Sequence, residues 1–377
     1  MSSKFITSML LPGLLIHGSF SFAVEPSDAA RKLLSELTVR ESAEPIRNHP
    51  EWTKPKRIIF LSSGIGSGLN EERLARLQSA ADGAELLVLN TLNEAKDKLA
   101  DTDVLMGSCA AVLPEMQNLK WVQHFTAGVE GCVSHQGFLQ SGAMLSNMKG
   151  VYGSGIAEHV IAMMFSFSRG LHEFERQRQA KKWDRSLAGR YPMLELRDKT
   201  LFIVGLGGIG TEIAWRAHGL GMRVIASRNS SRAKPDFVDY VGLSDELYEL
   251  AAEADIVVNT TPLTSSTTGL FDRRFFSKLK SSAYFINVGR GKSVVTADLV
   301  SALKSGKLAG AGLDVVEPEP LAADHELWTL PNVIITPHIS GRSDLVMQRF
   351  WIFIRENLRR YVQGEKLLNV VNLKKGY

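Results

Sequence analysis

Three polar residues in the last third of the chain have the side chains that acid–base chemistry on a carboxylate requires. Arg290 stands between two glycines, Glu319 lies in a proline-flanked acidic turn, and His338 follows an apolar segment. Arginine stays protonated and can hold a carboxylate, whereas histidine exchanges protons near neutral pH. Taken singly, each could be a structural ion pair, a solvated acid or a loop histidine. Three such residues at the ends of predicted strands favour a catalytic site.

A glycine-rich turn is the second chemical signal. Residues 205–210 (GLGGIG) follow the apolar segment 200–204 and lead into a helical pattern at 211–217. In this setting the first glycine permits the tight turn, the second lets the backbone approach a pyrophosphate, and the third lets helix pack on strand. An ordinary tight turn is the alternative, but the complete βαβ context favours dinucleotide binding. The residues expected at the cofactor are Gly205, Gly207, Gly208, Ile209 and Gly210.

The loop after the next predicted strand indicates which dinucleotide is bound. An NAD site usually carries an acidic residue about 20 residues beyond the glycines, where it binds the ribose hydroxyls. This chain has Arg228 there, with Arg232 one short loop away. Arginine can bind a 2′-phosphate bidentately, whereas a carboxylate would repel it. We therefore expect NADP(H) as the preferred cofactor. NAD(H) is the alternative if both arginines are only solvated loop residues.

Length and composition set the outer bounds of the fold. The 377 residues exceed one typical domain, and an apolar fraction of 44% can fill sizeable cores. The net charge of +4 is small, and no basic block suggests a nucleic-acid partner. Cys109 and Cys132 have no metal-ligand spacing and imply no disulfide framework. We therefore expect two small buried residues there, and no metal site.

The first 23 residues resemble a secretory signal peptide. Lys4 precedes an apolar stretch over residues 5–16, and Ser21 and Ala23 fit the small-residue rule for cleavage after Ala23. The apolar core is too short for a comfortable membrane-spanning helix, so we expect no membrane association after processing. These features predict an exported, periplasmic protein. A cytoplasmic protein is the alternative, because nicotinamide cofactors are expected inside cells.

Beyond this leader, apolar strand patterns alternate with helical patterns in two series. The alternation predicts parallel strands, and hence an α/β fold with two doubly wound parallel-sheet domains. A single long helical pattern from Gly155 to Trp183 separates the two series. The first series has predicted strands at 57–61, 85–89, 103–106 and 120–123, and the second has strands at 200–204, 223–226, 255–259, 283–288, 309–315 and 333–336.

Together these motifs resemble the D-isomer-specific 2-hydroxyacid dehydrogenase family, whose relatives include glyoxylate/hydroxypyruvate reductases and phosphoglycerate dehydrogenase. The resemblance runs from about Trp52 to the C-terminus, and the closing residues resemble a branch of general 2-ketoacid reductases. The matching segments are 125–130 (FTAGVE), 157–159 (AEH), 205–210, 261–264 (TPLT) with Thr268, 288–291 (VGRG), 313–315 (LDV) with Glu319, and 327–338, which ends in Thr336, Pro337 and His338.

The resemblance implies a D-stereospecific hydride transfer between NADP(H) and a small 2-ketoacid, with Arg290, Glu319 and His338 as the catalytic residues. Arg290 would hold the substrate carboxylate and polarise the C2 oxygen, His338 would supply the proton, and Glu319 would favour the imidazolium. The backbone N–H groups of Ala127 and Gly128 would also bind the substrate. The remaining cofactor contacts that the resemblance implies are Thr260, Thr261, Thr268, Val288 and Asp314.

The resemblance also implies a domain arrangement and an assembly. Residues 50–150 plus 342–377 would form a flavodoxin-like substrate domain, with a Rossmann cofactor domain (151–341) inserted in it. The long helix would build a homodimer. Two alternatives are a nicotinamide-sensing binding protein on the same scaffold and phosphoglycerate dehydrogenase. The complete set of three catalytic residues argues against the first, and the lack of a clear phosphate-binding cluster in the substrate half argues against the second.

Overall fold

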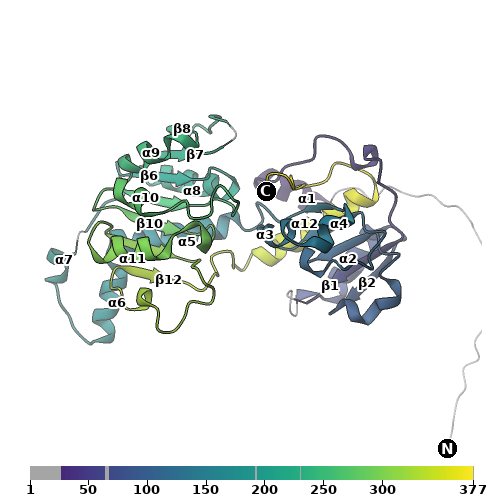
Figure 1. The fold of residues 1–377 in the computed structure, drawn as a ribbon, viewed down its shortest axis with the longest axis horizontal. Helices are drawn as coiled ribbons and strands as arrows, with labels where there is room; N and C mark the ends of the chain where they lie inside the picture. Colours follow the sequence, from purple (N-terminus) through teal and green to yellow (C-terminus); the bar gives the residue numbers. More distant parts are fainter. Residues whose placement is uncertain (1–26, 64–67, 192, 230, 377) are drawn as a thin grey trace, which may run out of the picture.

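A computed structural model describes residues 27–63, 68–191, 193–229 and 231–376 of the chain (Figure 1). The expected signal peptide therefore lies outside the described residues. Two separate sheets, each with only parallel strands, are flanked by helices. This arrangement confirms the predicted α/β fold class. In the described residues, no helix combines the length and apolar character that a bilayer span requires.

The first sheet has five strands in the order β2-β1-β3-β4-β5. This is the flavodoxin-like doubly wound order, in which ligands bind beyond the carboxyl ends of the strands. The first four strands begin within one residue of their predicted starts. The fifth was not predicted, because three residues are too few for a periodic pattern. The strands are β1 (Arg57–Leu61), β2 (Glu85–Leu89), β3 (Val104–Gly107), β4 (Trp121–His124) and β5 (Met144–Ser146).

The second sheet has seven strands in the order β12-β11-β10-β9-β6-β7-β8. Six of them follow the 3-2-1-4-5-6 order of dinucleotide-binding folds, and β12 extends that sheet. The strand order reverses between β6 and β9, so a crevice for ligand is expected at their carboxyl ends. The strands are β6 (Thr200–Val204), β7 (Arg223–Ser227), β8 (Tyr240–Gly242), β9 (Ile256–Asn259), β10 (Tyr284–Asn287), β11 (Gly310–Leu313) and β12 (Val333–Ile335).

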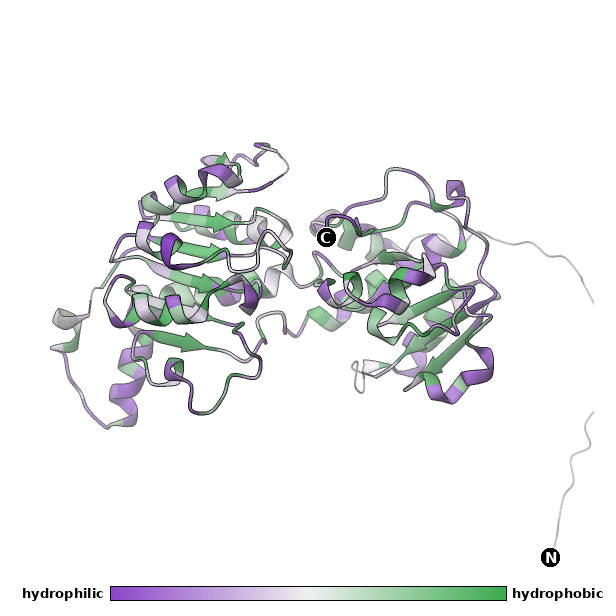
Figure 2. Cartoon of the chain, in the orientation of Figure 1, coloured by the Kyte–Doolittle hydropathy of each residue, from purple (hydrophilic) through white to green (hydrophobic). Residues whose placement is uncertain are grey.

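Helices cover both faces of each sheet, and hydrophobic residues concentrate in the strands between them (Figure 2). In the first domain they are α1 (Asp28–Glu36), α2 (Glu71–Ala81), α3 (Glu130–Val133), α4 (Gln136–Ser141) and α12 (Val346–Val362). The helices of the second domain are α5 (Gly153–Ser168), α6 (Leu171–Gln179), α7 (Leu187–Arg190), α8 (Gly208–Gly219), α9 (Leu247–Glu253), α10 (Arg273–Lys278) and α11 (Thr296–Lys304), of which α6 and α7 lie outside the layers that cover the sheet.

The prediction of one continuous helix from Gly155 to Trp183 is wrong. The chain forms α5 and α6 instead, and Gly170 between them has a φ of 64°. Glycine adopts this left-handed conformation at little cost, whereas a continuing α-helix excludes it. The break separates an apolar helix, which packs on α8, from a polar one with no buried residue.

The C-terminal helix α12 returns to the first domain and packs on α1 and α2. Its Glu356 is fully buried and binds Arg359 at 3.0 Å and Arg360 at 2.8 Å. Arg360 also binds Glu41, in the segment before the first strand, at 2.7 Å. A buried charge is tolerated when it is paired in this way, and the pairs fix the N-terminal segment to the last helix.

Candidate active site

The glycine turn after β6 has the geometry that its sequence predicts. Gly205 has a φ of 101°, which makes the tight turn possible. A Cβ at Gly210 would lie 2.6 Å from the Gly205 carbonyl oxygen, so only glycine lets α8 pack this closely on β6. A Cβ at Gly207 would meet nothing within 4 Å. The side chain of Ile209 packs on the core, so only its backbone is available to a ligand.

Two threonines after β9 support this turn. The Thr260 hydroxyl donates to the Gly205 carbonyl at 2.6 Å, and the Thr261 hydroxyl donates to Asn259 Oδ1 at 2.7 Å. Two other expected contacts lie near the same strand ends. Val288 is buried directly after β10, and the exposed Thr268 hydroxyl donates to the Thr264 carbonyl at 2.8 Å.

The two arginines after β7 do not converge. One terminal nitrogen of the Arg228 guanidinium donates to the Ala233 carbonyl at 3.1 Å. The second terminal nitrogen donates to the Leu206 carbonyl in the glycine turn. Arg232 binds Glu246 at 2.6 Å and donates to the Tyr240 hydroxyl at 2.8 Å. Arg228 is therefore held at the glycine turn, whereas the charge of Arg232 is compensated by a carboxylate elsewhere.

A buried aspartate organises the loop that carries His338. Asp314, at the end of β11, accepts hydrogen bonds from the Thr336 hydroxyl at 2.6 Å and the Ile339 amide at 3.0 Å. Burial by itself would raise the pKa of Asp314, but hydrogen bonds from Ser340, Thr336 and the loop amides lower it overall. The ionised carboxylate thus holds the loop, in which His338 has a φ of 53°. Both carboxylate oxygens face this loop.

His338 and Glu319 form a direct pair. Nδ1 of His338 lies 2.8 Å from Glu319 Oε2, and the other oxygen of Glu319 accepts from the Val316 amide at 3.1 Å. Both side chains are partly open to solvent. The pairing uses Nδ1 of His338 and leaves the opposite ring nitrogen, Nε2, without a hydrogen bond to any described residue.

The Arg290 side chain reaches from the cofactor domain into a loop of the other domain. Its Nε donates to Glu130 Oε1 at 2.6 Å, and one terminal nitrogen donates to the Gly289 carbonyl at 2.7 Å. The remaining nitrogen lies against Gly128, where an added Cβ would stand 1.6 Å from it. Burial would raise the pKa of Glu130, but the hydrogen bond and charge of Arg290 lower it overall. Gly128 and Glu130 thus position the guanidinium.

The loop after β4 presents the two expected substrate-binding amides. Asn147 donates to the Ala127 carbonyl at 2.8 Å, and the Thr126 hydroxyl donates to the Gly128 carbonyl at 3.0 Å. Among the described residues, no acceptor bonds to the N–H of Ala127 or of Gly128. The carbonyls of Ala127 and Gly128 therefore accept hydrogen bonds from side chains, and the amides of these two residues are available to an anion.

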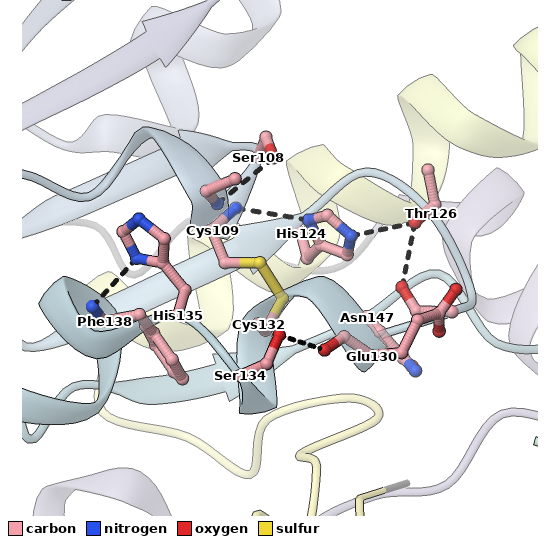
Figure 3. The surroundings of a disulfide bond; sticks show 12 residues. Ser108, Cys109, His124, Thr126, Glu130, Cys132, Ser134, His135, Phe138 and Asn147 are labelled. Carbon is pink, nitrogen blue, oxygen red and sulfur yellow. Dashed lines mark hydrogen bonds between the residues drawn. A yellow bond between two sulfur atoms is a disulfide. The ribbon is translucent and has the colours of Figure 1, made fainter. Parts of the chain in front are cut away.

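A disulfide between Cys109 and Cys132 lies beneath this loop (Figure 3). The expectation of two buried residues holds, but they are bonded to each other, with 5.3 Å between their Cα atoms. Their spacing of 23 residues could not reveal this, because pairing depends on distance in space. The sulfurs and His124 are close enough to suit a metal ion, but metal binding needs thiolates and the disulfide uses both.

His124 connects the disulfide to the substrate loop (Figure 3). Its Nδ1 accepts from the Cys109 amide at 3.4 Å, and its Nε2 lies 2.8 Å from the Thr126 hydroxyl. Burial is the main reason that the pKa of His124 is lowered, so the ring is neutral at pH 7. A neutral ring with the proton on Nε2 donates a hydrogen bond to the Thr126 hydroxyl, and that hydroxyl donates to the Gly128 carbonyl.

Two positioning residues, Glu130 and His159, were not expected from the sequence. Both lie in segments singled out for the family resemblance, FTAGVE and AEH, but their partners are more than 150 residues away. His159 Nε2 lies 3.0 Å from the Thr336 hydroxyl, which binds Asp314. Only the fold brings such distant residues together, so no local pattern could assign them these partners.

Comparison with known proteins places the chain in a family. Residues 161–340 match the NAD binding domain of D-isomer specific 2-hydroxyacid dehydrogenases. The chain is 33% identical over 327 residues to glyoxylate/hydroxypyruvate reductase B of Klebsiella pneumoniae, an overlap of 85% of this chain and 98% of the relative. The chain belongs to the D-isomer specific 2-hydroxyacid dehydrogenase family. It is therefore an NAD(P)-dependent oxidoreductase.

Solved structures share the two-domain architecture. One is an NADPH-dependent glyoxylate/hydroxypyruvate reductase of Sinorhizobium meliloti in complex with NADP and sulfate. It is 28% identical, with a TM-score of 0.72 and coverage of 86% of this chain and all of that chain. Another is a probable 2-hydroxyacid dehydrogenase of Rhizobium etli in complex with NADP, HEPES and L(+)-tartaric acid. It is 27% identical, with a TM-score of 0.71, and the match covers 86% of this chain and all of that chain.

Proposed function

We propose that this enzyme reduces a small 2-ketoacid of the glyoxylate or hydroxypyruvate type to the D-2-hydroxy acid with NADPH. The observation that carries the proposal is the Arg290 guanidinium, held by Glu130 against the free amides of the Ala127–Gly128 loop. A fixed cation beside unoccupied amides suits a small carboxylate. The names of the Klebsiella and Sinorhizobium relatives support the same substrate class.

Each residue then has a defined task. Arg290 and the amides of Ala127 and Gly128 bind the substrate carboxylate, and Arg290 also stabilises charge that develops on the C2 oxygen. His338 donates a proton to that oxygen, and Glu319 stabilises the imidazolium that donates it. A bound nicotinamide supplies the hydride. The glycine turn has room for its pyrophosphate, because Gly207 faces open space at the start of α8.

The NADP(H) preference rests on Arg228. Arg228 is fixed at the glycine turn and occupies the position where an NAD site has an acidic residue. Arg232 contributes less than the sequence suggested, because Glu246 compensates its charge. The Sinorhizobium and Rhizobium structures contain NADP, which supports the assignment.

We also propose that the enzyme is a homodimer. Trp215 on α8 is 59% exposed and Leu171 on α6 is 55% exposed. Ile161 on α5 and Leu220 line a hollow of about 450 Å³ beside Trp215. An exposed tryptophan beside an apolar hollow commonly marks a protein interface.

Export is proposed on two grounds. The leader over residues 1–23 has the signal-peptide pattern, and the disulfide between Cys109 and Cys132 is typical of proteins that fold in an oxidising compartment.

The proposed reaction predicts turnover with NADPH on a panel of ketoacids that includes glyoxylate, hydroxypyruvate, pyruvate and 3-phosphohydroxypyruvate. We expect the highest kcat/KM with the small unphosphorylated acids. The His338→Ala variant should lose about 10²–10⁴-fold in kcat, because it lacks the proton donor, and should bind NADPH normally. NADPH oxidation in a spectrophotometer measures both. Binding without turnover would favour the nicotinamide-sensing alternative, and preference for the phosphorylated acid would favour phosphoglycerate dehydrogenase.

The cofactor proposal predicts that Arg228→Asp weakens NADPH use and spares NADH. The KM for NADPH should rise about tenfold or more, because one charge-assisted hydrogen bond is lost and a repulsive charge is gained. The kcat should change little, since the 2′-phosphate is remote from the hydride. Arg232→Gln is the matched control and should keep the wild-type preference. Equal use of both cofactors by the wild type would refute the proposal.

The dimer proposal predicts a mass in solution of twice the 41.5 kDa chain, less any leader that is removed. The Trp215→Glu variant should shift the protein toward monomer, because a charge would be buried in the apolar interface. Size-exclusion chromatography with light scattering measures this. A monomeric wild type at micromolar concentration would contradict the proposal.

The export proposal predicts that protein recovered from its native host begins at Val24 and has no free thiol without reductant. Cleavage after Ala23 gives that N-terminus, and the disulfide consumes both cysteines. N-terminal sequencing and thiol titration under denaturing conditions test the two points. Active protein that begins at Met1 or Ser2, with two free thiols, would place the enzyme in the cytoplasm.

A further inference from the structure

The segment that follows α1 lies against the phosphate-binding turn of the other domain. A Cβ built at Gly208, the first residue of α8, would stand 2.5 Å from the Thr38 hydroxyl oxygen. A Cβ at Gly150 would stand 3.3 Å from the Thr38 carbonyl carbon. Thr38 is therefore packed between the segment after β5 and the start of α8, where dinucleotide phosphates bind.

One asparagine fixes two cationic residues beside Thr38. The Arg40 amide donates to Asn369 Oδ1 at 3.0 Å, and the Asn369 amide donates back to the Arg40 carbonyl at 2.7 Å. The side-chain amide of Asn369 also donates to the Lys149 carbonyl at 2.7 Å. Figure 1 shows the purple chain near α1 and the yellow C-terminal segment close to each other, on the side of the first domain that faces the second. The backbones of Arg40 and Lys149 are thus held together.

The charged ends of these side chains have no compensating partner. Within the described residues, neither Lys149 Nζ nor the Arg40 guanidinium makes a hydrogen bond or an ion pair. Burial, followed by the positive charges of Arg40 and Arg228, lowers the pKa of Lys149. Burial, followed by Arg40, also lowers the pKa of Arg228. Three cations therefore repel one another beside the glycine turn, and no carboxylate is among the charges that act on Lys149.

Like charges held together by a fixed backbone make a site for an anion, because an anion removes their repulsion. We propose that Lys149 and Arg40 complete, together with Arg228, the binding site for the 2′-phosphate of NADP(H). The inference rests on the proposed NADP(H) preference. It assigns part of cofactor selectivity to the substrate domain and to the segment before its first strand. Arg232, which the sequence suggested as the partner of Arg228, is not part of this site.

The contributions of the two residues should differ. Lys149 is half-buried, so its ammonium would interact with a phosphate through less water than the exposed Arg40 guanidinium. Lys149 should therefore account for more of the selectivity. Both residues lie away from Arg290 and His338 in the chain, and among the described residues no hydrogen bond or ion pair joins either of them to Arg290 or His338. Their loss should affect cofactor affinity and leave the KM for the ketoacid unchanged.

Isothermal titration of NADP⁺ and NAD⁺ into the full-length protein tests the proposal. We expect Lys149→Gln to weaken NADP⁺ binding about tenfold, because one charge-assisted hydrogen bond is lost. The same variant should change NAD⁺ binding less than about twofold. Arg40→Gln should weaken NADP⁺ about two- to threefold, since an exposed charge is screened. Lys149→Arg, which keeps the charge, should keep most of the preference.

Lys96→Gln is the matched control. It removes one positive charge from the same domain, but it lies beside β2, at the opposite edge of the sheet from β5 and Lys149. It should leave both affinities unchanged. Thermal melting of each variant shows whether the fold is intact.

The outcomes separate this inference from the cofactor proposal. A wild type that binds NAD⁺ as tightly as NADP⁺ overturns the proposed preference and this site with it. A wild type that prefers NADP⁺, with the preference intact in Lys149→Gln, overturns this site alone. Equal weakening of both cofactors by Lys149→Gln also overturns it, because a pyrophosphate contact or a distorted turn would then explain the loss.

Discussion

The Arg290 guanidinium links the two domains at the candidate site, and the geometry of that site depends on it. Arg290 leaves the end of β10, binds Glu130 from the other domain and lies directly on Gly128. Any side chain at position 128 would overlap with it. A planar cation with five donors can bind a carboxylate on one side and still offer N–H groups on another. Two domains must therefore come together before the site is complete.

Each side of this contact is supported by buried polar groups. On the cofactor side, the Asp314 carboxylate accepts from the loop after β12 and so fixes His338. On the substrate side, the Cys109–Cys132 disulfide and His124 lie under the loop that carries Gly128. Catalytic groups must be held closely to their productive geometry, and such supporting contacts provide that rigidity. The side chains of His338 and Glu319 are partly exposed, whereas Asp314, His124 and the disulfide are buried.

The segment before the first strand also joins distant parts of the chain near the candidate site. It pairs with the last helix through Glu41 and Arg360, and with the chain after that helix through Arg40 and Asn369. The chain near Arg40 is thereby joined to the chain near Asn369, and Thr38 of the same segment lies at the start of α8. Cations gathered there without carboxylates store repulsion, which a phosphate would relieve. With the proposed 2′-phosphate site, cofactor recognition would depend on both domains, as the proposed substrate site does.

The sequence by itself determined the parallel α/β class, nearly all strand positions and the glycine turn, because hydrophobic periodicity and turn chemistry are local. It also singled out Arg290, Glu319 and His338, since each lies in the segment that follows a predicted strand. Only the tertiary structure decided that Cys109 bonds to Cys132 and that Glu130 of the other domain binds Arg290. It also decided that the charges of Lys149 and Arg228 act on each other, whereas Arg232 pairs with Glu246. It also broke the expected long helix at Gly170, because a glycine inside an apolar pattern does not reveal its backbone conformation. These contacts join residues far apart in the chain, and a local pattern contains no information about which distant segment will pack against it.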